Sequence, residues 1–504
     1  MRTSFLFDDT ICALATPSGM GAIATVRVSG PQAHAIVCRL FYRNGKAFQE
    51  IQIEGYRAYY GQIMSGETVL DEAVTTFFKA PHSFTGEDSA EISVHGSVYV
   101  QQRLLELLIE KGARMAQPGE FTRRAFVNRK FDLAQAEAVA DLIASQSEAA
   151  HRVAMNQLKG GFSKELQTLR SELLEITSLM ELELDFSEED VEFADRSRLK
   201  SLLETALEHM GKLTDSFRLG NAIRNGIPVA IVGQTNSGKS TLLNALLGED
   251  RAIVSDIAGT TRDTVEETLN LEGTLYRLID TAGIRDTEET IEKMGIERTF
   301  KKIAEAEIVL GVIDGTQSLD EVMEAAKAII SMVDLLKQSL VLLVNKCDII
   351  DTPHYYSIKD NMWFRLKTAY EKNIECHGGY MADEWGYSLT GREYRDLRNH
   401  MTFWMVSAKR SDDIEHLKHD MVYRTKSHKV EGDATVVTNV RHYEALKHAS
   451  ESLQAVQKGL SDNIPTDLVA QDLREALYYL GTITGEITTD EVLGSIFSRF
   501  CVGK

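Results

Sequence analysis

The pattern of apolar and polar positions over residues 1–126 predicts a compact α+β domain. Short runs of β-type alternation, bounded by turn residues, fall at Ile23–Val28, Glu72–Phe78 and Ala90–Val94. One stretch with helical spacing, Val98–Ile109, interrupts the strand-like part of the chain. Strands combined with a helix in this way are typical of an α+β domain.

From residue 127 to about residue 225 the pattern becomes helical. Apolar residues recur three and four positions apart, and no proline occurs between Pro118 and Pro228. The spacing is clearest at Leu133, Ala136, Val139, Ala140 and Ile143. These residues predict long amphipathic helices.

Strand and helix patterns alternate over residues 226–427, which is typical of a mostly parallel sheet. Helical patterns return over residues 428–504, where Thr488 with Glu491 fits a capping box at a helix start. The simplest arrangement is one all-α helical domain that is split in sequence. Its parts would be 127–225 and 428–504, with the α/β unit inserted between them.

Composition and charge narrow the classes of protein. The chain has 504 residues, of which 43% are apolar, with a net charge of −20 and cysteines scattered without a CxxC pair. We find no apolar run long enough to cross a membrane, and we expect no secretory signal, a cytoplasmic location and no membrane partner. The acidic balance argues against non-specific wrapping of nucleic acid, although it does not exclude a local basic patch. The cysteine spacing supports neither a zinc site nor a disulfide framework.

A phosphate-binding motif begins the α/β unit. The strand pattern Ile227–Val232 runs into Gly233–Ser240, whose sequence GQTNSGKS fits GxxxxGK[ST]. Glycines let the backbone turn so that successive N–H groups face phosphate oxygens, and the following helix presents its positive end to the same charge. We expect Lys239 to reach the β- and γ-phosphates and the Ser240 hydroxyl to bind Mg²⁺. An accidental glycine-rich turn is disfavoured by the strand before it and the helix after it.

Two further motifs would complete the phosphate site. Thr260 and Thr261 lie in the next loop, where one threonine typically closes over Mg²⁺ in the GTP state. Asp280–Gly283 (DTAG) follows the strand pattern Tyr276–Ile279. Its aspartate is placed to hold Mg²⁺ through water, and the Gly283 N–H is placed to sense the γ-phosphate.

Two later motifs would select guanine. Asn345–Asp348 (NKCD) follows the strand pattern Leu340–Val344, and the Asp348 carboxylate would accept hydrogen bonds from the guanine N1–H and exocyclic amine. Adenine lacks that pair of donors, so its binding would leave the carboxylate unpaired. Ser407–Lys409 (SAK) follows the strand pattern Thr402–Val406 and would contact the guanine carbonyl through its backbone. Each motif alone could be a surface loop, but the full set in this order predicts a GTP hydrolase.

The hydrolytic step departs from the Ras pattern. Ile284 stands where Ras-type enzymes carry a water-positioning glutamine, and isoleucine cannot polarise water. The amide oxygen of Asn236 could bind a monovalent cation, and K⁺ there would supply the charge that an arginine finger supplies elsewhere. The alternative is that Asn236 only forms a turn. Acidic residues that could orient water, or simply face solvent, are Asp286, Glu288, Glu289 and Glu292.

These residues resemble a known family, the tRNA-modifying GTPases called MnmE or TrmE. In the GTPase part the resemblance is carried by Asn236, Asp256–Asp263 (DIAGTTRD), Asp280–Arg285 (DTAGIR) and Gly295–Arg298 (GIER). Outside it, the matching segments are Ala15–Gly19, Val26–Gly30, Ser83–Asp88, His95–Gly96, Pro118–Phe126, Asp132–Ala138 and Phe500–Lys504. The matches cover nearly the whole chain except the aromatic segment 351–399.

The resemblance implies a fold and an activity. The expected fold is an N-terminal α+β domain (1–126) that binds tetrahydrofolate and dimerises, a split helical domain, and a Ras-like P-loop GTPase domain (226–427). The segment at about 351–399 is longer than the family pattern needs, and we interpret it as an insertion at the rim of the guanine pocket. Members of the family act with an FAD-dependent partner, MnmG. Together they attach an aminomethyl or carboxymethylaminomethyl group to C5 of wobble uridine 34 in certain tRNAs. The carbon comes from 5,10-methylene- or 5-formyl-tetrahydrofolate.

The resemblance also implies partners and site residues. We expect a homodimer, a heterotetramer with MnmG, contact with tRNA, and FAD only through that partner. Glu292 would orient water through a bridging water. Mg²⁺ would be bound by Ser240 and Thr261, one K⁺ per subunit by Asn236, Ser255, Ile257 and Thr260, and folate by Arg27, Glu91, Lys130 and Lys504. The full predicted GTP-binding set is Asn236, Ser237, Gly238, Lys239, Ser240, Thr241, Ser255, Asp256, Ile257, Ala258, Gly259, Thr260, Thr261, Asp280, Thr281, Ala282, Gly283, Asn345, Lys346, Asp348, Ser407, Ala408 and Lys409.

Three questions stay open at the level of residues. The aromatic side chains of segment 351–399 could stack on RNA bases, or form a small local core or a protein contact. Cys501, beside a folate and a uracil, could be a nucleophile or a tail residue that closes the pocket. A ribosome-assembly GTPase and a slow GTP-binding scaffold are alternative functions. A ribosome-assembly GTPase would carry a KH module or another GTPase domain, and we find no pattern for either. Ile284 is the residue that favours the GTP-binding scaffold.

Overall fold

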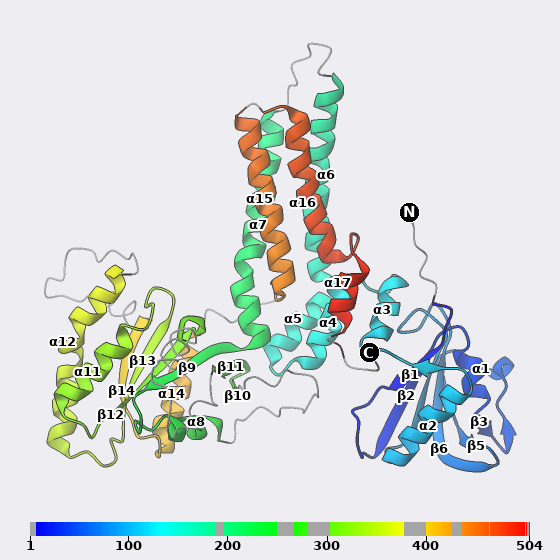
Figure 1. The fold of residues 1–504 in the computed structure, drawn as a ribbon, viewed down its shortest axis with the longest axis horizontal. Helices are drawn as coiled ribbons and strands as arrows, with labels where there is room; N and C mark the ends of the chain where they lie inside the picture. Colours follow the sequence, from blue (N-terminus) through cyan, green and yellow to red (C-terminus); the bar gives the residue numbers. More distant parts are fainter. Residues whose placement is uncertain are drawn as a thin grey trace. The chain divides into compact units, whose positions relative to one another are not determined.

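The chain divides into two compact units, drawn in Figure 1. The structure is a computed structural model that describes residues 7–186, 196–248, 267–279, 303–376, 400–425, 435–462, 464–498, 500 and 503. One unit comprises residues 1–143, 154–214 and 444–504, and the other comprises residues 144–153 and 215–443. Among the helices described, none is both long enough and apolar enough to cross a membrane.

An eight-stranded sheet with strand order β4-β3-β5-β6-β7-β2-β1-β8 forms the N-terminal part of the first unit. Its strands are β1 (Ile11–Leu14), β2 (Ile23–Ser29), β3 (Phe41–Arg43), β4 (Lys46–Ala47), β5 (Arg57–Ser65), β6 (Thr68–Phe78), β7 (Ser89–His95) and β8 (Arg114–Met115). Neighbouring strands are antiparallel, except that β8 runs parallel to β1. Strands β2, β6 and β7 contain the three predicted strand segments.

Helices complete the N-terminal part. They are α1 (Ala33–Cys38), the short 3₁₀ helix η1 (Glu50–Gln52), α2 (Val98–Glu110) and α3 (Glu120–Val127). Apolar residues of α1 and α2 pack in one buried cluster with alternate residues of β2, β5, β6 and β7. Because side chains alternate between the two faces of a strand, these helices cover the same face of the sheet. The predicted α+β architecture is confirmed.

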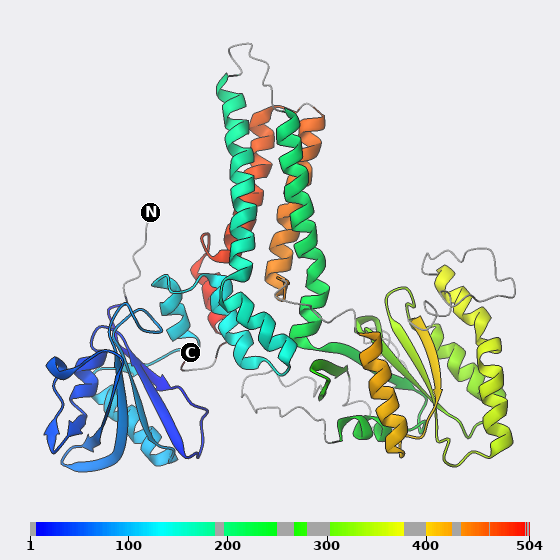
Figure 2. The same ribbon diagram turned by 180° about the vertical axis from the view of Figure 1, so that it is seen from behind.

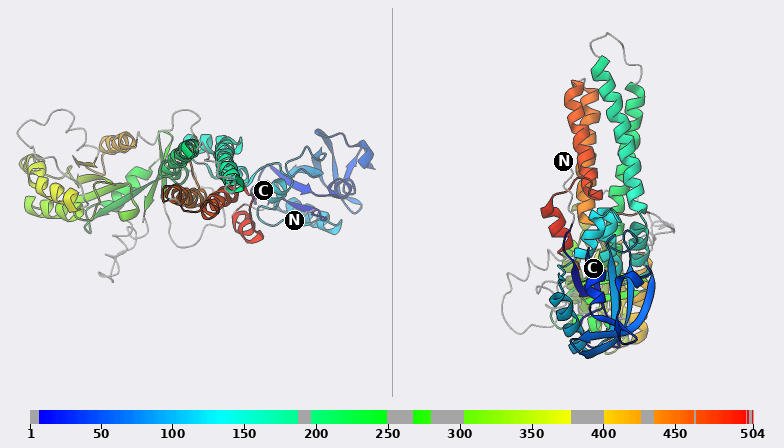
Figure 3. Two further views of the ribbon diagram at one scale, coloured as in Figure 1. Left: turned by 90° about the horizontal axis from the view of Figure 1, so that it is seen from above. Right: turned by 90° about the vertical axis from the view of Figure 1, so that its right-hand side faces the viewer.

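Long helices form the rest of the first unit and continue into the second. They are α4 (Leu133–Ala144), α5 (Glu148–Leu158), α6 (Gly161–Phe186), α7 (Arg196–Asn225), α15 (Val440–Ser461), α16 (Thr466–Thr484) and α17 (Asp490–Phe497). Figures 2 and 3 show α6, α7, α15 and α16 running side by side, with several of them seen end-on in the left view of Figure 3. Buried residues recur at helical spacing, as in Leu166, Leu169 and Leu173 of α6 and Leu446, Ala449 and Leu453 of α15. Helices from both ends of the sequence therefore share one bundle, which confirms the split helical domain.

The predicted cap of the last helix is wrong by one residue. Helix α17 is capped by Thr489, not by Thr488, and the Thr489 hydroxyl accepts the N–H of Val492 at 3.3 Å. Thr489 has the extended backbone conformation that an N-cap position needs, with φ −112° and ψ 157°. The capping-box pattern favoured Thr488, because Glu491 stands three residues after it, but the helix begins one residue later and Thr489 caps it without a box partner at Val492.

A six-stranded sheet with order β10-β11-β9-β12-β13-β14 is the centre of the second unit. Its strands are β9 (Ile227–Gly233), β10 (Glu267–Leu271), β11 (Thr274–Ile279), β12 (Ile308–Asp314), β13 (Ser339–Asn345) and β14 (Met401–Met405). All neighbouring pairs are parallel except β10 with β11. The predicted mostly parallel sheet is confirmed, and the strands predicted before the nucleotide motifs correspond to β9, β11, β13 and β14.

Two helical layers cover this sheet. Helices α8 (Lys239–Leu247) and α14 (Ser411–Arg424) pack on one face, and α11 (Leu319–Ile330) and α12 (Thr352–Cys376) pack on the other. Helix α12 is the first half of the aromatic segment, and its buried residues include Ile358, Met362, Leu366 and Tyr370. Of its aromatic side chains, Tyr370 is buried in this core, whereas Tyr356 and Phe364 are 53% and 82% exposed, so the role of the aromatic segment stays an open question. Residues 377–399 lie outside the described part, and the predicted domain boundaries at 126, 225 and 427 stay predictions.

Candidate functional site

The carboxyl ends of β9, β12, β13 and β14 lie at one edge of the second sheet, because these parallel strands run in the same direction. In the chain, β9 is followed first by β10 and β11 on one side of it, and then by β12 to β14 on the other side. Ligands of open α/β sheets bind at such a switch point. The phosphate loop leaves β9, the NKCD motif leaves β13 and the SAK motif follows β14, so the fold brings these three motifs to one edge.

The turn between β9 and α8 is packed so closely that two of its residues must be glycine. Gly233 has φ +153°, and a Cβ there would lie 2.1 Å from the carbonyl oxygen of Val312. Gly238 has φ +100°, and a Cβ there would lie 2.1 Å from Nδ2 of Asn345. Asn236 is left-handed as well, with φ +64°, a region that asparagine enters more readily than most residues. The backbone has the tight turn that the motif predicts.

Lys239 opens α8, and its ammonium lies back over the loop. Nζ donates hydrogen bonds to the carbonyl oxygens of Gly233 at 3.0 Å and Gln234 at 2.7 Å. Burial lowers the pKa of this ammonium below its usual value. A partly desolvated cation interacts more strongly with an anion than a hydrated one does, so this position suits a phosphate held by the loop.

Asn345 connects the phosphate loop to the SAK loop. Its side-chain Nδ2 donates to the carbonyl oxygen of Ser237 at 2.9 Å, and its Oδ1 accepts the N–H of Ala408 at 2.9 Å. The side chain is buried, with 4% of the residue exposed. Because buried amide groups are costly to leave unpaired, the two bonds fix the distance between these loops. Asn345 was predicted to bind GTP, and in this structure it joins the loops that would surround GTP.

An ion pair holds Lys346, the second residue of the NKCD motif, in place. Lys346 forms an ion pair with Asp314, at the end of β12, with 2.6 Å between Nζ and Oδ2. The other oxygen of Asp314 accepts the N–H and the hydroxyl of Thr316. Burial alone would raise the pKa of Asp314, but the hydrogen bonds from Lys346 and Thr316 outweigh it and lower that pKa. The carboxylate is therefore ionised and fastens Lys346 to the neighbouring strand.

Asp348 is an exposed carboxylate at the predicted base-binding position. Its pKa is lowered, first by a hydrogen bond from the Ser407 hydroxyl, against a smaller opposing effect of burial, and further by the cations Lys409 and Arg410. The carboxyl is thus ionised at neutral pH, and a carboxylate accepts hydrogen bonds without donating any. That property matches the pair of donors on the edge of guanine.

Several residues of this site were missed by sequence reasoning. Asp413 of α14 accepts the N–H of Ser407 at 2.8 Å. His354 of α12 contacts the carbonyl oxygens of Gly315 at 3.1 Å and Gln317 at 2.8 Å through Nε2, and so supports the loop after β12. Of the missed residues, only Asp314 could have been identified from the sequence, because it is a carboxylate at the end of an apolar strand pattern. In the structure it lies opposite Asn345 in the register of β12 and β13.

Part of the predicted site lies outside the described residues. These positions are Ser255, Asp256, Ile257, Ala258, Gly259, Thr260, Thr261, Asp280, Thr281, Ala282, Gly283 and Glu292, together with Lys504 and Cys501. The described members of the predicted cation sites are Asn236 and Ser240, and both are exposed residues of the loop or the first turn of α8. Their side-chain oxygens are ligands that K⁺ and Mg²⁺ accept, so these two residues fit the predicted sites.

Of the predicted folate residues, Arg27 and Glu91 lie in the N-terminal sheet and Lys130 lies just after α3. Arg27 of β2 and Glu91 of β7 are directly opposite in the register, and their side chains form an ion pair at 2.8 Å. The Arg27 guanidinium lies 5.1 Å from the ring centre of Phe84, and its Nη1 is 3.5 Å from the carbonyl oxygen of Gly503. Lys130 donates to the carbonyl oxygen of Pro81, in the loop that carries Phe84, at 3.1 Å. A restrained guanidinium and a nearby ammonium fit a ligand with carboxylates.

Comparison with known proteins adds an independent line of argument. Residues 133–501 match the family described as MnmE helical domain, and residues 10–130 match the family described as GTP-binding protein TrmE N-terminus. The tRNA modification GTPase MnmE of Bacteroides thetaiotaomicron is 47% identical over 501 residues, which cover 98% of this chain and 99% of that protein. The protein of the same name from Parabacteroides distasonis is 46% identical over 500 residues, which cover 98% and 100% of the two chains.

A comparison of structures is much weaker. A GTP-binding protein from Sulfolobus solfataricus, crystallised with GDP, is 18% identical and covers 52% of this chain and 68% of its own, with a TM-score of 0.25. A score this low supports no argument about the fold or the function.

Proposed function

This chain belongs to the MnmE family of tRNA modification GTPases, and we propose that it is a K⁺-stimulated GTP hydrolase that acts on the wobble uridine of certain tRNAs. With an FAD-dependent partner, MnmG, it would add an aminomethyl or carboxymethylaminomethyl group to C5 of uridine 34. A tetrahydrofolate derivative, 5,10-methylene- or 5-formyl-tetrahydrofolate, would supply the carbon, and FAD would enter only through the partner. The match of this chain's residues to the family pattern supports these finer steps.

The observation that best supports the nucleotide part of this proposal is the bridge made by Asn345. One buried amide holds the carbonyl of Ser237 in the phosphate loop and the N–H of Ala408 in the SAK loop. A ligand that contacts both loops must extend from a triphosphate site at the phosphate loop to a base site at the SAK loop. The ionised Asp348 carboxylate adds the preference for guanine.

The chain's own groups would act in three ways during hydrolysis. The N–H groups of the loop 233–240 and the Lys239 ammonium would hold the phosphates. Ser240 and Thr261 would bind Mg²⁺, and Asn236, Ser255, Ile257 and Thr260 would bind K⁺. These cations would supply positive charge where negative charge develops on the phosphates. Glu292 would orient the attacking water in place of the glutamine that Ile284 replaces.

The N-terminal domain would bind folate. Arg27 and Lys130 would pair with its carboxylates, and Glu91 would accept from donors of the pterin, with Lys504 as a further cation. In the proposed assembly this chain forms a homodimer, joins MnmG in a heterotetramer and acts on tRNA. GTP hydrolysis would then drive a conformational change that prepares the modification and would not be a chemical step of it.

Reconstitution tests this proposal. Purified chain, MnmG, unmodified tRNA, GTP and 5,10-methylenetetrahydrofolate labelled in the methylene carbon are incubated in KCl or in NaCl. We expect label in uridine 34 and faster GTP turnover in KCl than in NaCl. Equal and negligible turnover in both salts would favour the GTP-binding scaffold instead. Turnover without any label in the tRNA would contradict the folate-dependent step.

A further inference from the structure

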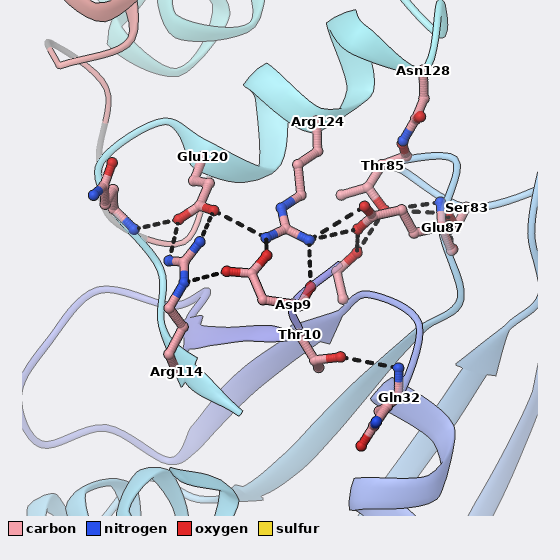
Figure 4. Close-up of polar contacts among 12 residues, drawn as sticks. Asp9, Thr10, Gln32, Ser83, Thr85, Glu87, Arg114, Glu120, Arg124 and Asn128 are labelled. Carbon is pink, nitrogen blue, oxygen red and sulfur yellow. Dashed lines mark hydrogen bonds and ion pairs between the residues drawn. The ribbon is translucent and has the colours of Figure 1, made fainter. Parts of the chain in front are cut away.

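A completely buried arginine lies at the centre of a charged network in the N-terminal domain, shown in Figure 4. The Arg124 side chain is 0% exposed, and three carboxylates surround its guanidinium. The distances are 2.7 Å to Asp9, 3.1 Å to Glu120 and 3.2 Å to Glu87. Arg124 also donates to the carbonyl oxygen of Asp9 at 2.9 Å. No residue of this network belongs to the predicted folate or nucleotide sites.

The network fastens one loop to one helix. The loop between β6 and β7 is tied to α3 and the residues just after it at three places. These contacts are Arg124 with Glu87 at 3.2 Å, Asn128 with the carbonyl oxygen of Thr85 at 2.8 Å, and Lys130 with the carbonyl oxygen of Pro81 at 3.1 Å. Glu87 is also bonded to Ser29 of β2 at 2.8 Å. The loop is therefore held between the helix and the sheet.

The loop and the helix each bring one aromatic ring to Arg27. The Arg27 guanidinium lies 5.1 Å from the ring centre of Phe84, on the loop, and 5.7 Å from that of Phe121, on α3. Such distances are those of favourable contacts between a cation and an aromatic ring. The separation of the two rings depends on how the loop is joined to α3. The ion pair between Arg124 and Glu87 joins the loop to α3.

The charges in the network disfavour rearrangement of its members, most strongly at the buried side chains of Arg124 and Glu120. Arg114 pairs with Asp9 and Glu120, so two guanidinium groups are shared among three carboxylates. The loss of hydration of a buried charge is offset only when its partners are well placed. If one charged group of the network moves, the group that it faced is left unpaired. The network therefore favours a single geometry of the loop over alternatives in which Phe84 turns away from Arg27.

We propose that Arg124 is a positioning residue for the folate site. Through Glu87 it fixes the loop that carries Phe84, and Phe84 with Phe121 fixes the Arg27 guanidinium that would receive a carboxylate of the ligand. This inference rests on the proposed function, because it assumes that Arg27 binds folate. Arg124 acts through Arg27 and does not touch the ligand.

The test uses full-length variants and the affinity for 5-formyltetrahydrofolate, measured by calorimetry well below the unfolding temperature. Glu87→Gln retains the size of the side chain and removes the charge that faces Arg124. We expect its Kd for folate to rise about tenfold, as for the loss of one charge-assisted hydrogen bond. Arg124→Met should weaken binding further, and Arg124→Lys, which retains the charge, should recover part of the loss. Arg103→Met, an α2 arginine paired with Glu106 and Glu110, is the control and should bind as wild type does.

A double variant separates positioning from general stability. If Glu87 acts through Phe84, then Glu87→Gln combined with Phe84→Leu should bind folate no more weakly than Phe84→Leu alone. A purely structural role would lower the unfolding temperature and leave the folate Kd of the folded variants unchanged, which would overturn the inference.

Glu87→Gln tests the positioning role even if Arg124→Met does not fold. If wild type itself does not bind folate, the folate part of the proposed function fails and this inference fails with it. If wild type binds and Glu87→Gln binds equally well, only this inference fails.

Discussion

The side chain of Asn345 donates a hydrogen bond to the carbonyl oxygen of Ser237 at 2.9 Å, so a residue of the base-binding motif holds the phosphate loop in place. The same amide accepts the N–H of Ala408 at 2.9 Å. In addition, Gly238 approaches Asn345 so closely that any side chain there would collide with its amide. The phosphate loop and the loop predicted to bind the base are therefore physically joined through one side chain.

Replacing Asn345 with alanine should weaken nucleotide binding. The change leaves a buried carbonyl and a buried N–H without partners, at about 1–3 kcal/mol, which corresponds to a rise in Kd of about 5- to 150-fold. Titration with fluorescent GDP and GTP measures this effect. Asn225→Ala is a matched control, because that exposed amide bonds only Asn221 among the described residues. A Kd for Asn345→Ala within twofold of wild type would contradict the bridging role.

Asp348→Asn should change which base the protein prefers. The amide offers one acceptor and one donor, so it no longer satisfies both donors of guanine, at about 1–3 kcal/mol for the unpaired group. Xanthine carries a carbonyl where guanine carries its amine, so the variant should bind xanthosine triphosphate better than GTP. Competition between the two nucleotides measures the preference. A variant that still prefers GTP as strongly as wild type would show that another group reads the base.

His354→Ala should speed the release of GDP. Its Nε2 contacts the carbonyl oxygens of Gly315 and Gln317, in the loop that directly follows Asp314, and Asp314 holds Lys346. Loss of one neutral hydrogen bond costs about 0.5–1.5 kcal/mol, so we expect an increase in Kd of about 2- to 10-fold. Stopped-flow release of fluorescent GDP tests this. His419→Ala, at an exposed position of α14, should release GDP at the wild-type rate.

The network around Arg124 predicts a dependence of stability on acid. Burial alone would raise the pKa of Glu120, but hydrogen bonds from Arg114, from the Gln117 N–H and from Arg124 outweigh it and lower that pKa below 4.5. A lowered pKa means that the ionised carboxylate stabilises the folded state at pH values above about 4.5. This contribution is lost as the pH falls through the folded pKa.

The comparison of wild type with Glu120→Gln isolates that contribution. We expect the variant to be less stable by about 1.5–3 kcal/mol at pH 7, the range for hydrogen bonds to charged groups. The difference should begin to shrink as the pH falls below about 4.5, where the unfolded chain takes up the proton, and it should vanish below the lower folded pKa, where folded wild type loses the charge as well. Thermal unfolding of the full chain between pH 3 and pH 7 measures it. A difference that stays constant over this range would contradict the assignment.

Much of the fold could be predicted because its signals are local. The strand Ile227–Val232 and the motif after it predicted β9 and the start of α8, since apolar runs and glycines act over a few residues. Helical spacing at Leu133 and Ala136 likewise predicted the helices that follow. Local patterns are weaker at the ends of elements, and the choice of Thr488 over Thr489 as a cap shows that limit.

The rest of the site depended on pairings that are distant in sequence. Arg124 bonds Asp9, 115 residues away, and Asn345 bonds Ser237, 108 residues away. No local pattern of charge or polarity indicates which carboxylate reaches which arginine once the chain is folded. Asn345 was predicted as a site residue from its motif, but its bonds to backbone groups of two loops followed only from the three-dimensional arrangement.

The proposed function makes this GTPase necessary for the modification of wobble uridine. Nucleoside analysis by mass spectrometry, applied to tRNA from a strain without this protein and from the same strain carrying wild type or Lys239→Ala, tests it most directly. We predict that the modified uridine disappears without the protein, returns with wild type and does not return with Lys239→Ala. Unchanged modified uridine in the strain without the protein, or full recovery with Lys239→Ala, would contradict the account.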